Sequence, residues 1–103
     1  MIVYIAAPCT LGDVGKNLNR VFEVADQIAS LGHTPYIPHL NHLWHIVSPK
    51  TQQFWLNYDL KFLDFCDALL RLDGESEGAD EEVRQAIEWG LPVYYSVEAI
   101  SEI

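Results

Sequence analysis

The apolar positions of the chain fall into alternating short runs and helical stripes. Residues Ile2 to Ala6 form a short apolar run, which predicts a strand buried on both faces of a sheet. From Val14 onward the apolar residues recur with the spacing of one helical face, and Asp13 and Gly32 provide a start and a stop. This stripe occupies positions 14, 18, 21, 22, 25, 28 and 29. The pattern therefore predicts a strand followed by a long helix.

The rest of the chain repeats this alternation. We expect strands at 34–38, 68–72 and 92–95, helices at 51–64, 79–90 and from Val97 onward, and a histidine-rich loop at 39–50 with room for a short helix. Such alternation produces right-handed crossovers and a parallel sheet covered by helices on both faces. We predict one doubly wound, Rossmann or flavodoxin-like α/β domain over residues 1–103, with a parallel sheet of four or five strands.

Composition limits the class of protein. The chain has 103 residues, half of them hydrophobic, which suffices for one packed core. A formal net charge of −9 repels nucleic-acid polymers, and no apolar run is long enough to act as a membrane helix. The start of the chain lacks the features of a signal peptide, and two distant cysteines suggest no disulfide framework. These features favour a cytoplasmic protein that binds small molecules.

Candidate chemistry gathers between the third predicted strand and the helix after it. In sheets of this kind ligands bind beyond the carboxyl ends of the strands, here beside the loops at 7–15 and 73–78. The segment 75–82 carries five carboxylates. At about 100° per residue, Glu81 and Glu88 point away from the apolar stripe of this helix, whereas Glu82 lies at its edge. Glu82 is therefore the acid expected to be partly buried and turned toward the crevice, with Asp80 as the alternative.

Several short motifs along the chain resemble the nucleoside 2-deoxyribosyltransferases and the related deoxynucleotide N-hydrolases. They are the opening run Val-Tyr-Ile-Ala at 3–6, Asp-Leu at 59–60, Cys-Asp-Ala at 66–68, Ser-x-Gly-x-x-x-Glu at 76–82 and Gly-Leu-Pro-Val at 90–93. The resemblance implies that Glu82 is a nucleophile that attacks the anomeric carbon of the sugar, and that Asp59 assists departure of the base. An exposed helix carboxylate is an equal alternative for Asp59. Asp67 is expected to have a structural role.

The resemblance, together with the position of residues beside the predicted crevice, suggests a set of substrate contacts. Transferases that act on free nucleosides tend to have an acid where this chain has Ser76, whereas the monophosphate hydrolases resemble this chain, so we expect a 5′-phosphate near Ser76. A simple helix cap is the alternative for Ser76. The further candidate contacts are Tyr4, Pro8, Thr10, Lys16, Arg20, His42, Trp44, Gly78 and, toward the site of a neighbouring subunit, Ser96. Tyr4 can equally be a core residue.

The histidines His39, His42 and His45 raise the question of a metal site. Their spacing, the flanking prolines and the lack of a fourth ligand nearby argue against zinc. They favour a cap of imidazole and aromatic groups that covers a purine or pyrimidine base. We expect no metal and no cofactor.

Departures from the better-studied family members leave several functions open. Those members have glycine at the position of Asp80 and Leu-Gly where this chain has Val83 and Arg84. The leading hypothesis is hydrolysis of the N-glycosidic bond of a (deoxy)nucleoside 5′-monophosphate by a homodimer or higher homo-oligomer. A nucleoside 2-deoxyribosyltransferase, a non-catalytic nucleotide-binding module and cleavage of another N-ribosyl compound such as NAD are the alternatives.

Overall fold

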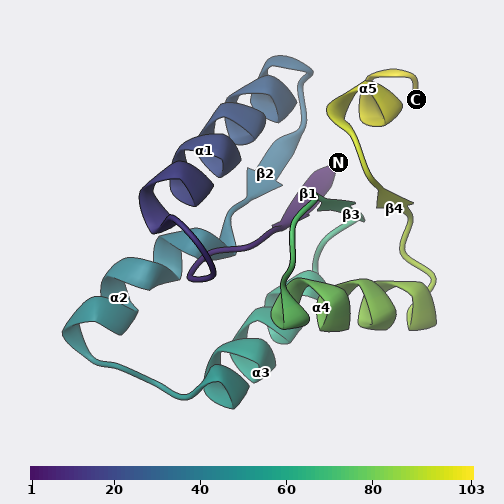
Figure 1. Cartoon of the computed structure of the whole chain (residues 1–103). Helices are drawn as coiled ribbons and strands as arrows, with labels where there is room; N and C mark the ends of the chain where they lie inside the picture. Colours follow the sequence, from purple (N-terminus) through teal and green to yellow (C-terminus); the bar gives the residue numbers. More distant parts are fainter.

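The computed structural model describes all 103 residues and contains a four-stranded parallel sheet with helices on both faces (Figure 1). The strands are β1 (Ile2–Ala6), β2 (Thr34–Tyr36), β3 (Ala68–Arg71) and β4 (Val93–Tyr94). The helices are α1 (Val14–Ser30), α2 (His42–Val47), α3 (Gln52–Leu63), α4 (Glu77–Glu88) and α5 (Val97–Ser101), with a 3₁₀ turn η1 at Pro38–Asn41. The predicted α/β architecture is confirmed.

The strand order places a switch in chain direction at β1. The order across the sheet is β2-β1-β3-β4, so the chain moves from β1 to β2 on one side and then crosses to β3 and β4 on the other. The loops that follow β1 and β3 therefore leave the same edge of the sheet from neighbouring strands. A crevice at this point is where open α/β sheets bind their ligands.

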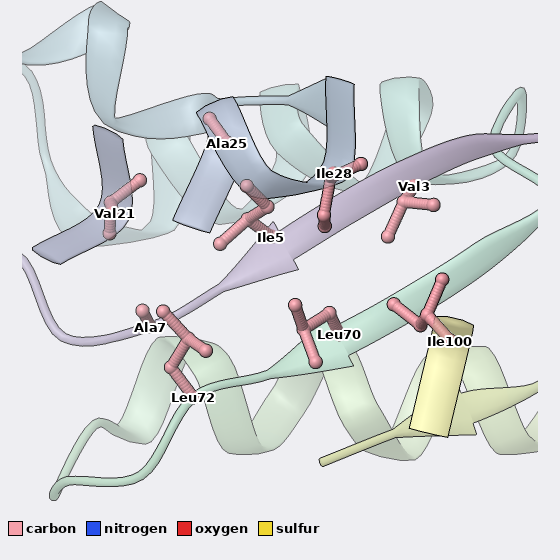
Figure 2. Packing of buried hydrophobic residues seen from close by; sticks show 9 residues of the cluster. All are labelled: Val3, Ile5, Ala7, Val21, Ala25, Ile28, Leu70, Leu72 and Ile100. Carbon is pink, nitrogen blue, oxygen red and sulfur yellow. The ribbon is translucent and has the colours of Figure 1, made fainter. Parts of the chain in front are cut away.

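The first face of the sheet packs against α1 and α5. Figure 2 shows its core, to which alternate residues of β1 contribute Val3 and Ile5. The whole cluster comprises Val3, Ile5, Ala7, Val21, Ala25, Ile28, Leu70, Leu72 and Ile100. The helical stripe predicted from Val14 supplies three of these residues from α1, which is why that helix covers this face.

The second face packs against α3 and α4 and carries the side chains of the other strand residues. Tyr4 and Ala6 of β1 lie here because successive strand residues point to opposite faces. The full cluster comprises Tyr4, Ala6, Leu63, Cys66, Leu69, Ala79 and Ala86. Residues 3–6 of β1 are all completely buried, as predicted for a central strand. Tyr4 therefore faces α4, the helix that carries Glu82.

Side-chain caps set the starts of several helices. The predicted cap Asp13 accepts a hydrogen bond from the backbone N–H of Lys16. Ser76 caps α4 in the same way, so this helix begins at Glu77, two residues earlier than predicted. Asp67 accepts a hydrogen bond from the backbone N–H of Ile2 and ties the start of β1 to β3, which is a structural role.

Three predicted strands are shorter than expected, β3 by its last residue only, and the histidine-rich segment is more regular. β2 ends at Tyr36 because η1 begins at Pro38, and β4 keeps only Val93 and Tyr94. Residues 39–50 contain most of η1 and all of α2, which has no buried residue. No helix combines the length and the apolar composition that crossing a bilayer requires.

Candidate active site

An open cleft of about 1550 Å³ lies at the carboxyl ends of β1 and β3. Its walls come from the two loops after these strands, from η1 and α2, from the first half of α3 and from the start of α4. This is the location predicted from the alternation of strands and helices. Its volume is larger than that of many small-ligand pockets, which measure roughly 300–1000 Å³.

Glu82 is the most deeply buried acid of the chain and lies in the wall of this cleft. It is 7% exposed and belongs to the buried side of α4 with Ala79 and Ala86, one turn before and one turn after it. The hydroxyl of Tyr4 donates a hydrogen bond to its Oε2. Burial is the main reason that the pKa of Glu82 rises to about 8; the Tyr4 hydrogen bond lowers this pKa, nearby Asp59 raises it and Arg71 lowers it.

Asp59 is the second carboxyl in the cleft. It lies on α3, is partly buried, and its Oδ1 accepts a hydrogen bond from Nδ2 of Asn41. Burial raises its pKa to about 7, and the Asn41 hydrogen bond lowers it. Asp59 is thus no ordinary exposed helix carboxylate, and it is close enough to Glu82 to influence its charge. The cleft holds two carboxyls that titrate near neutral pH.

Two other acids near the start of α4, Asp80 and Glu81, have cationic partners. Asp80 Oδ1 lies 3.0 Å from a guanidinium nitrogen of Arg71, and Glu81 pairs with Arg84 one turn along the helix. Arg71 also donates to the backbone carbonyls of Leu72 and Gly74, so it ties the loop after β3 to α4. Asp80, the alternative to Glu82, is therefore paired and more than half exposed.

The loop after β1 forms the neighbouring wall. Pro8 and Thr10 both line the cleft, as predicted. Gly74, with φ of +114°, lies so close to Pro8 that a Cβ atom would approach Pro8 Cγ to 2.8 Å. His39 lies beneath this loop, where its Nε2 is 3.1 Å from the carbonyl oxygens of both Ala7 and Pro8. These contacts fix the loop against η1 and the loop after β3.

The three histidines do not form a metal site. His39 is buried and turned toward the loop after β1, and burial lowers its pKa. His42 and His45 line the cleft, with ring centroids 6.4 Å apart. No group of three or more His, Cys, Asp or Glu side chains is placed to hold a metal ion.

Trp44 does not line the cleft, contrary to the expectation that it covers a base there. On a helix, residues two positions apart point to different sides, so His42 and Trp44 of α2 do not share a face. Trp44 instead packs edge-on against Phe54, Trp55 and Tyr58 of α3. Trp55 is the tryptophan that lines the cleft.

Four further candidate contacts do not line this cleft. Lys16 and Arg20 lie outside the cleft, and Arg20 is bound to both the carboxylate and the backbone carbonyl of Asp73. Tyr4 reaches the site only through Glu82, since it is completely buried. Ser96 caps α5 and does not line this cleft, so a contact with the site of a neighbouring subunit stays a prediction.

Ser76 and Gly78 both line the cleft at the start of α4. The Oγ atom of Ser76 accepts the backbone N–H of Ala79, so the capping interpretation is correct for this side chain. A Cβ atom on Gly78 would meet nothing within 4 Å, which leaves open space at this position.

Sequence reasoning missed two residues of the site. Trp55 lies four positions before Asp59 on α3, so the helical period alone would have placed both on the cleft side. Asn41 carried no such signal, because its contact with Asp59 depends on how η1 packs against α3.

Comparison with known proteins agrees with this architecture. The solved structure of a 2-deoxyribosyltransferase from the psychrotolerant bacterium Bacillus psychrosaccharolyticus has a similar fold, with a TM-score of 0.68 and 21% sequence identity. The match covers 90% of this chain and 69% of that chain. No curated protein matches the sequence.

The family comparison covers most of the chain. The model of the family described as "Domain of unknown function (DUF7768)" matches residues 1–96. This protein therefore belongs to the DUF7768 family.

Proposed function

We propose that this protein cleaves the N-glycosidic bond of a (deoxy)nucleoside or its 5′-monophosphate, with Glu82 as the nucleophile. The observation that carries the proposal is the pair of buried or partly buried carboxyls, Glu82 and Asp59, in one cleft. Cleavage of a glycosidic bond needs an anion at the anomeric carbon and a proton for the leaving group. With pKa values of about 7 for Asp59 and about 8 for Glu82, the pair shares one proton near neutral pH, and the reactive form is the fraction in which Asp59 holds the proton and Glu82 is ionised.

The proposed first step forms an ester between Glu82 and the sugar. An ionised oxygen of Glu82 attacks C1′, the bond from C1′ to the base nitrogen breaks, and the base leaves with the proton of Asp59. In the second step water attacks C1′ and gives its proton to Asp59, which releases the sugar and restores the Glu82 carboxylate. Attack by a second base in place of water would make the protein a transferase.

Tyr4 and Asn41 would orient the two carboxyls. The hydroxyl of Tyr4 donates to Glu82, and burial together with the Glu82 charge raises the pKa of Tyr4 well above its usual value, so this hydroxyl remains a donor. It holds one oxygen of Glu82 and stabilises the ionised form that attacks. Asn41 holds one oxygen of Asp59 in the same manner.

The charges that line the cleft favour a free nucleoside over its monophosphate. The acidic lining residues are Asp59, Glu75, Glu77, Asp80, Glu81 and Glu82, whereas the basic ones are Lys50 and Arg84. Ser76, which sequence reasoning assigned to a phosphate, stands between Glu75 and Glu77, and Arg84 is bound to Glu81. A 5′-hydroxyl avoids the repulsion that a phosphate dianion meets beside these carboxylates. Nucleosides and their monophosphates are both tested, since the N-terminus of a helix such as α4 can also bind a phosphate.

We also propose that the protein acts as a homo-oligomer. The apolar side chains of Leu43, Ile46 and Val47 on α2 are 70%, 62% and 84% exposed, beside the cleft. Such a group of exposed apolar residues is typical of an interaction surface. A second subunit over α2 would also narrow the open cleft, with Ser96 as a candidate contact.

The activity is tested by measuring freed base. The protein is incubated with deoxynucleosides, their 5′-monophosphates, ribonucleotides and NAD, with and without an acceptor base, and the products are separated by chromatography. We expect release from deoxynucleosides, loss of release by at least about 10³-fold in Glu82→Gln, and little change in Glu88→Gln, the matched control, because Glu88 is an exposed acid on the same helix that does not line the cleft.

The outcomes separate the candidate functions. Turnover that requires the acceptor base indicates a transferase. Faster release of base from monophosphates than from nucleosides supports the predicted contact between Ser76 and a phosphate. Binding without release in the wild type identifies a non-catalytic module. Release that persists in Glu82→Gln removes Glu82 from the mechanism.

A further inference from the structure

One ring nitrogen of His45 accepts two hydrogen bonds. Its Nδ1 accepts the indole N–H of Trp55 at 2.8 Å and the backbone N–H of Lys50 at 3.1 Å. Both donors belong to groups that cannot act as acceptors. The Nδ1 atom of His45 must therefore be the unprotonated nitrogen of the neutral ring.

This bonding fixes the tautomer of His45. In neutral imidazole one nitrogen carries the proton and the other accepts, so the proton of His45 is on Nε2. The Nε2 atom makes no hydrogen bond within the protein and is accessible, and the ring lines the cleft. The neutral side chain thus offers a ligand a hydrogen-bond donor and no acceptor.

His45 lies on the side of the cleft where the proposed reaction places the base of the substrate. Its ring contacts Trp55, with centroids 5.9 Å apart, and Trp55 lies one helical turn before Asp59 on α3. Both α3 residues line the cleft. In the proposed reaction Asp59 gives its proton to the leaving base, so the base lies at the wall of the cleft that Asp59 shares with Trp55, and His45 is in contact with Trp55 there.

We infer that His45 selects the base of the substrate by donating from Nε2 to a carbonyl oxygen, so that oxo-substituted bases bind better than their amino-substituted counterparts. A carbonyl oxygen accepts this hydrogen bond, whereas an exocyclic amino group would set donor against donor. The inference rests on the proposed function, because it requires a nucleoside in the cleft.

The tautomer is measured first, because it does not depend on any activity. Two-dimensional ¹H–¹⁵N spectra of the imidazole rings at pH 8 identify the protonated nitrogen of each histidine. We expect His45 as the pure Nε2–H form in the wild type. In Trp55→Phe, which keeps the His45 ring but removes one of its two donors, we expect Nε2–H to stay the major tautomer, because the Lys50 N–H still donates to Nδ1, and Nδ1–H to appear as a minor form. A His45 ring protonated on Nδ1 in the wild type overturns the inference.

Base selection is measured by binding to the Glu82→Gln protein, in which cleavage is not expected to consume the ligand. The matched pairs are 2′-deoxyinosine against 2′-deoxyadenosine and 2′-deoxyuridine against 2′-deoxycytidine. We expect the oxo member of each pair to bind about tenfold or more tightly. Adding His45→Gln, whose amide can donate or accept, should reduce the ratio to about twofold or less. Trp55→Phe should reduce it in the same direction, which provides a second test should the His45 variant not fold.

Failure of the inference and failure of the proposed function give different results. Equal binding of oxo and amino nucleosides, with the tautomer fixed as described, removes the selecting role of His45 and leaves the role of Glu82 intact. An oxo preference that persists in His45→Gln has the same meaning. Absence of nucleoside binding in both wild type and Glu82→Gln overturns the proposed function and the inference together.

Discussion

Replacing Glu82 with glutamine should make the protein more stable at alkaline pH, although it removes the proposed nucleophile. Burial raises the pKa of Glu82 from an ordinary value of 4.5 to about 8. The folded state therefore favours the protonated carboxyl, and keeping the ionised form buried costs free energy. Below pH 4.5 this cost is absent because the side chain is protonated in both states. It grows as the pH rises through the window from 4.5 to 8 and is constant above it.

The size of the effect follows from the two pKa values. One pKa unit corresponds to about 1.4 kcal/mol, so the cost is roughly 3 kcal/mol at pH 7 and about 5 kcal/mol well above pH 8. The Glu82 side chain is almost fully buried, so solvent screening does not reduce this figure greatly. A neutral glutamine has no such cost and can still accept the hydrogen bond from Tyr4. The cost is a large part of the 5–15 kcal/mol that stabilises a typical domain.

The assay is urea unfolding between pH 4 and pH 9, followed by circular dichroism and tryptophan fluorescence. We expect the difference in unfolding free energy between Glu82→Gln and wild type to increase with pH by several kcal/mol. Glu81→Gln is the matched control, because Glu81 is exposed and paired with Arg84, and its curve should run parallel to that of the wild type. A Glu82→Gln curve parallel to the wild type would refute the argument that Glu82 is buried as a high-pKa acid.

Three further predictions concern the cleft. The rate of base release should follow a bell-shaped pH profile with limbs near the pKa values of about 7 and about 8, which belong to Asp59 and Glu82 as a coupled pair; a rate independent of pH from 5 to 9 would contradict it. Tyr4→Phe should raise the pKa of Glu82 further, because the ionised form loses a donor. In urea titrations the fall of stability with pH should therefore extend to higher pH in this variant than in the wild type. The same pH range in both proteins would show that the hydroxyl has no effect on Glu82. Gly74→Ala should cost about 1–3 kcal/mol in urea unfolding because of its positive φ and the approach to Pro8, whereas Gly78→Ala, in a helix with open space around it, should be neutral or slightly stabilising; equal effects of the two substitutions would contradict the close approach.

The sequence predicted best what depends on local periodicity. The run at 2–6 and the stripe from Val14 define β1 and α1, and the alternation with the later elements indicates the parallel sheet. The same argument placed Glu82 at the edge of a buried stripe, and the structure buries it there. Residues 39–50 gave no comparable signal, because α2 has no buried residue and so no core-facing stripe to detect.

The contacts that sequence reasoning missed join distant parts of the chain. Tyr4 and Glu82 are 78 positions apart, and their hydrogen bond depends on the alternation of β1 and on the packing of α4 against the same face. Each residue was a candidate, but their pairing was not predictable. Trp44 was assigned to the cleft from its place among the histidines, and Trp55 takes that position because it shares the face of α3 with Asp59.

The central claim, that Glu82 forms a bond to the sugar, is tested most directly by trapping the glycosyl-enzyme. A 2′-fluoro-substituted nucleoside slows both steps, because fluorine destabilises the positive charge that develops at C1′, and the glycosyl-enzyme accumulates where its hydrolysis is slower than its formation. Mass spectrometry of the intact protein and of its peptides would then locate the bound sugar. We predict an added mass equal to one fluorinated sugar on the peptide that contains Glu82, and none in Glu82→Gln. A sugar attached to Asp59 or Asp80, or release of the base without any adduct, would contradict the account.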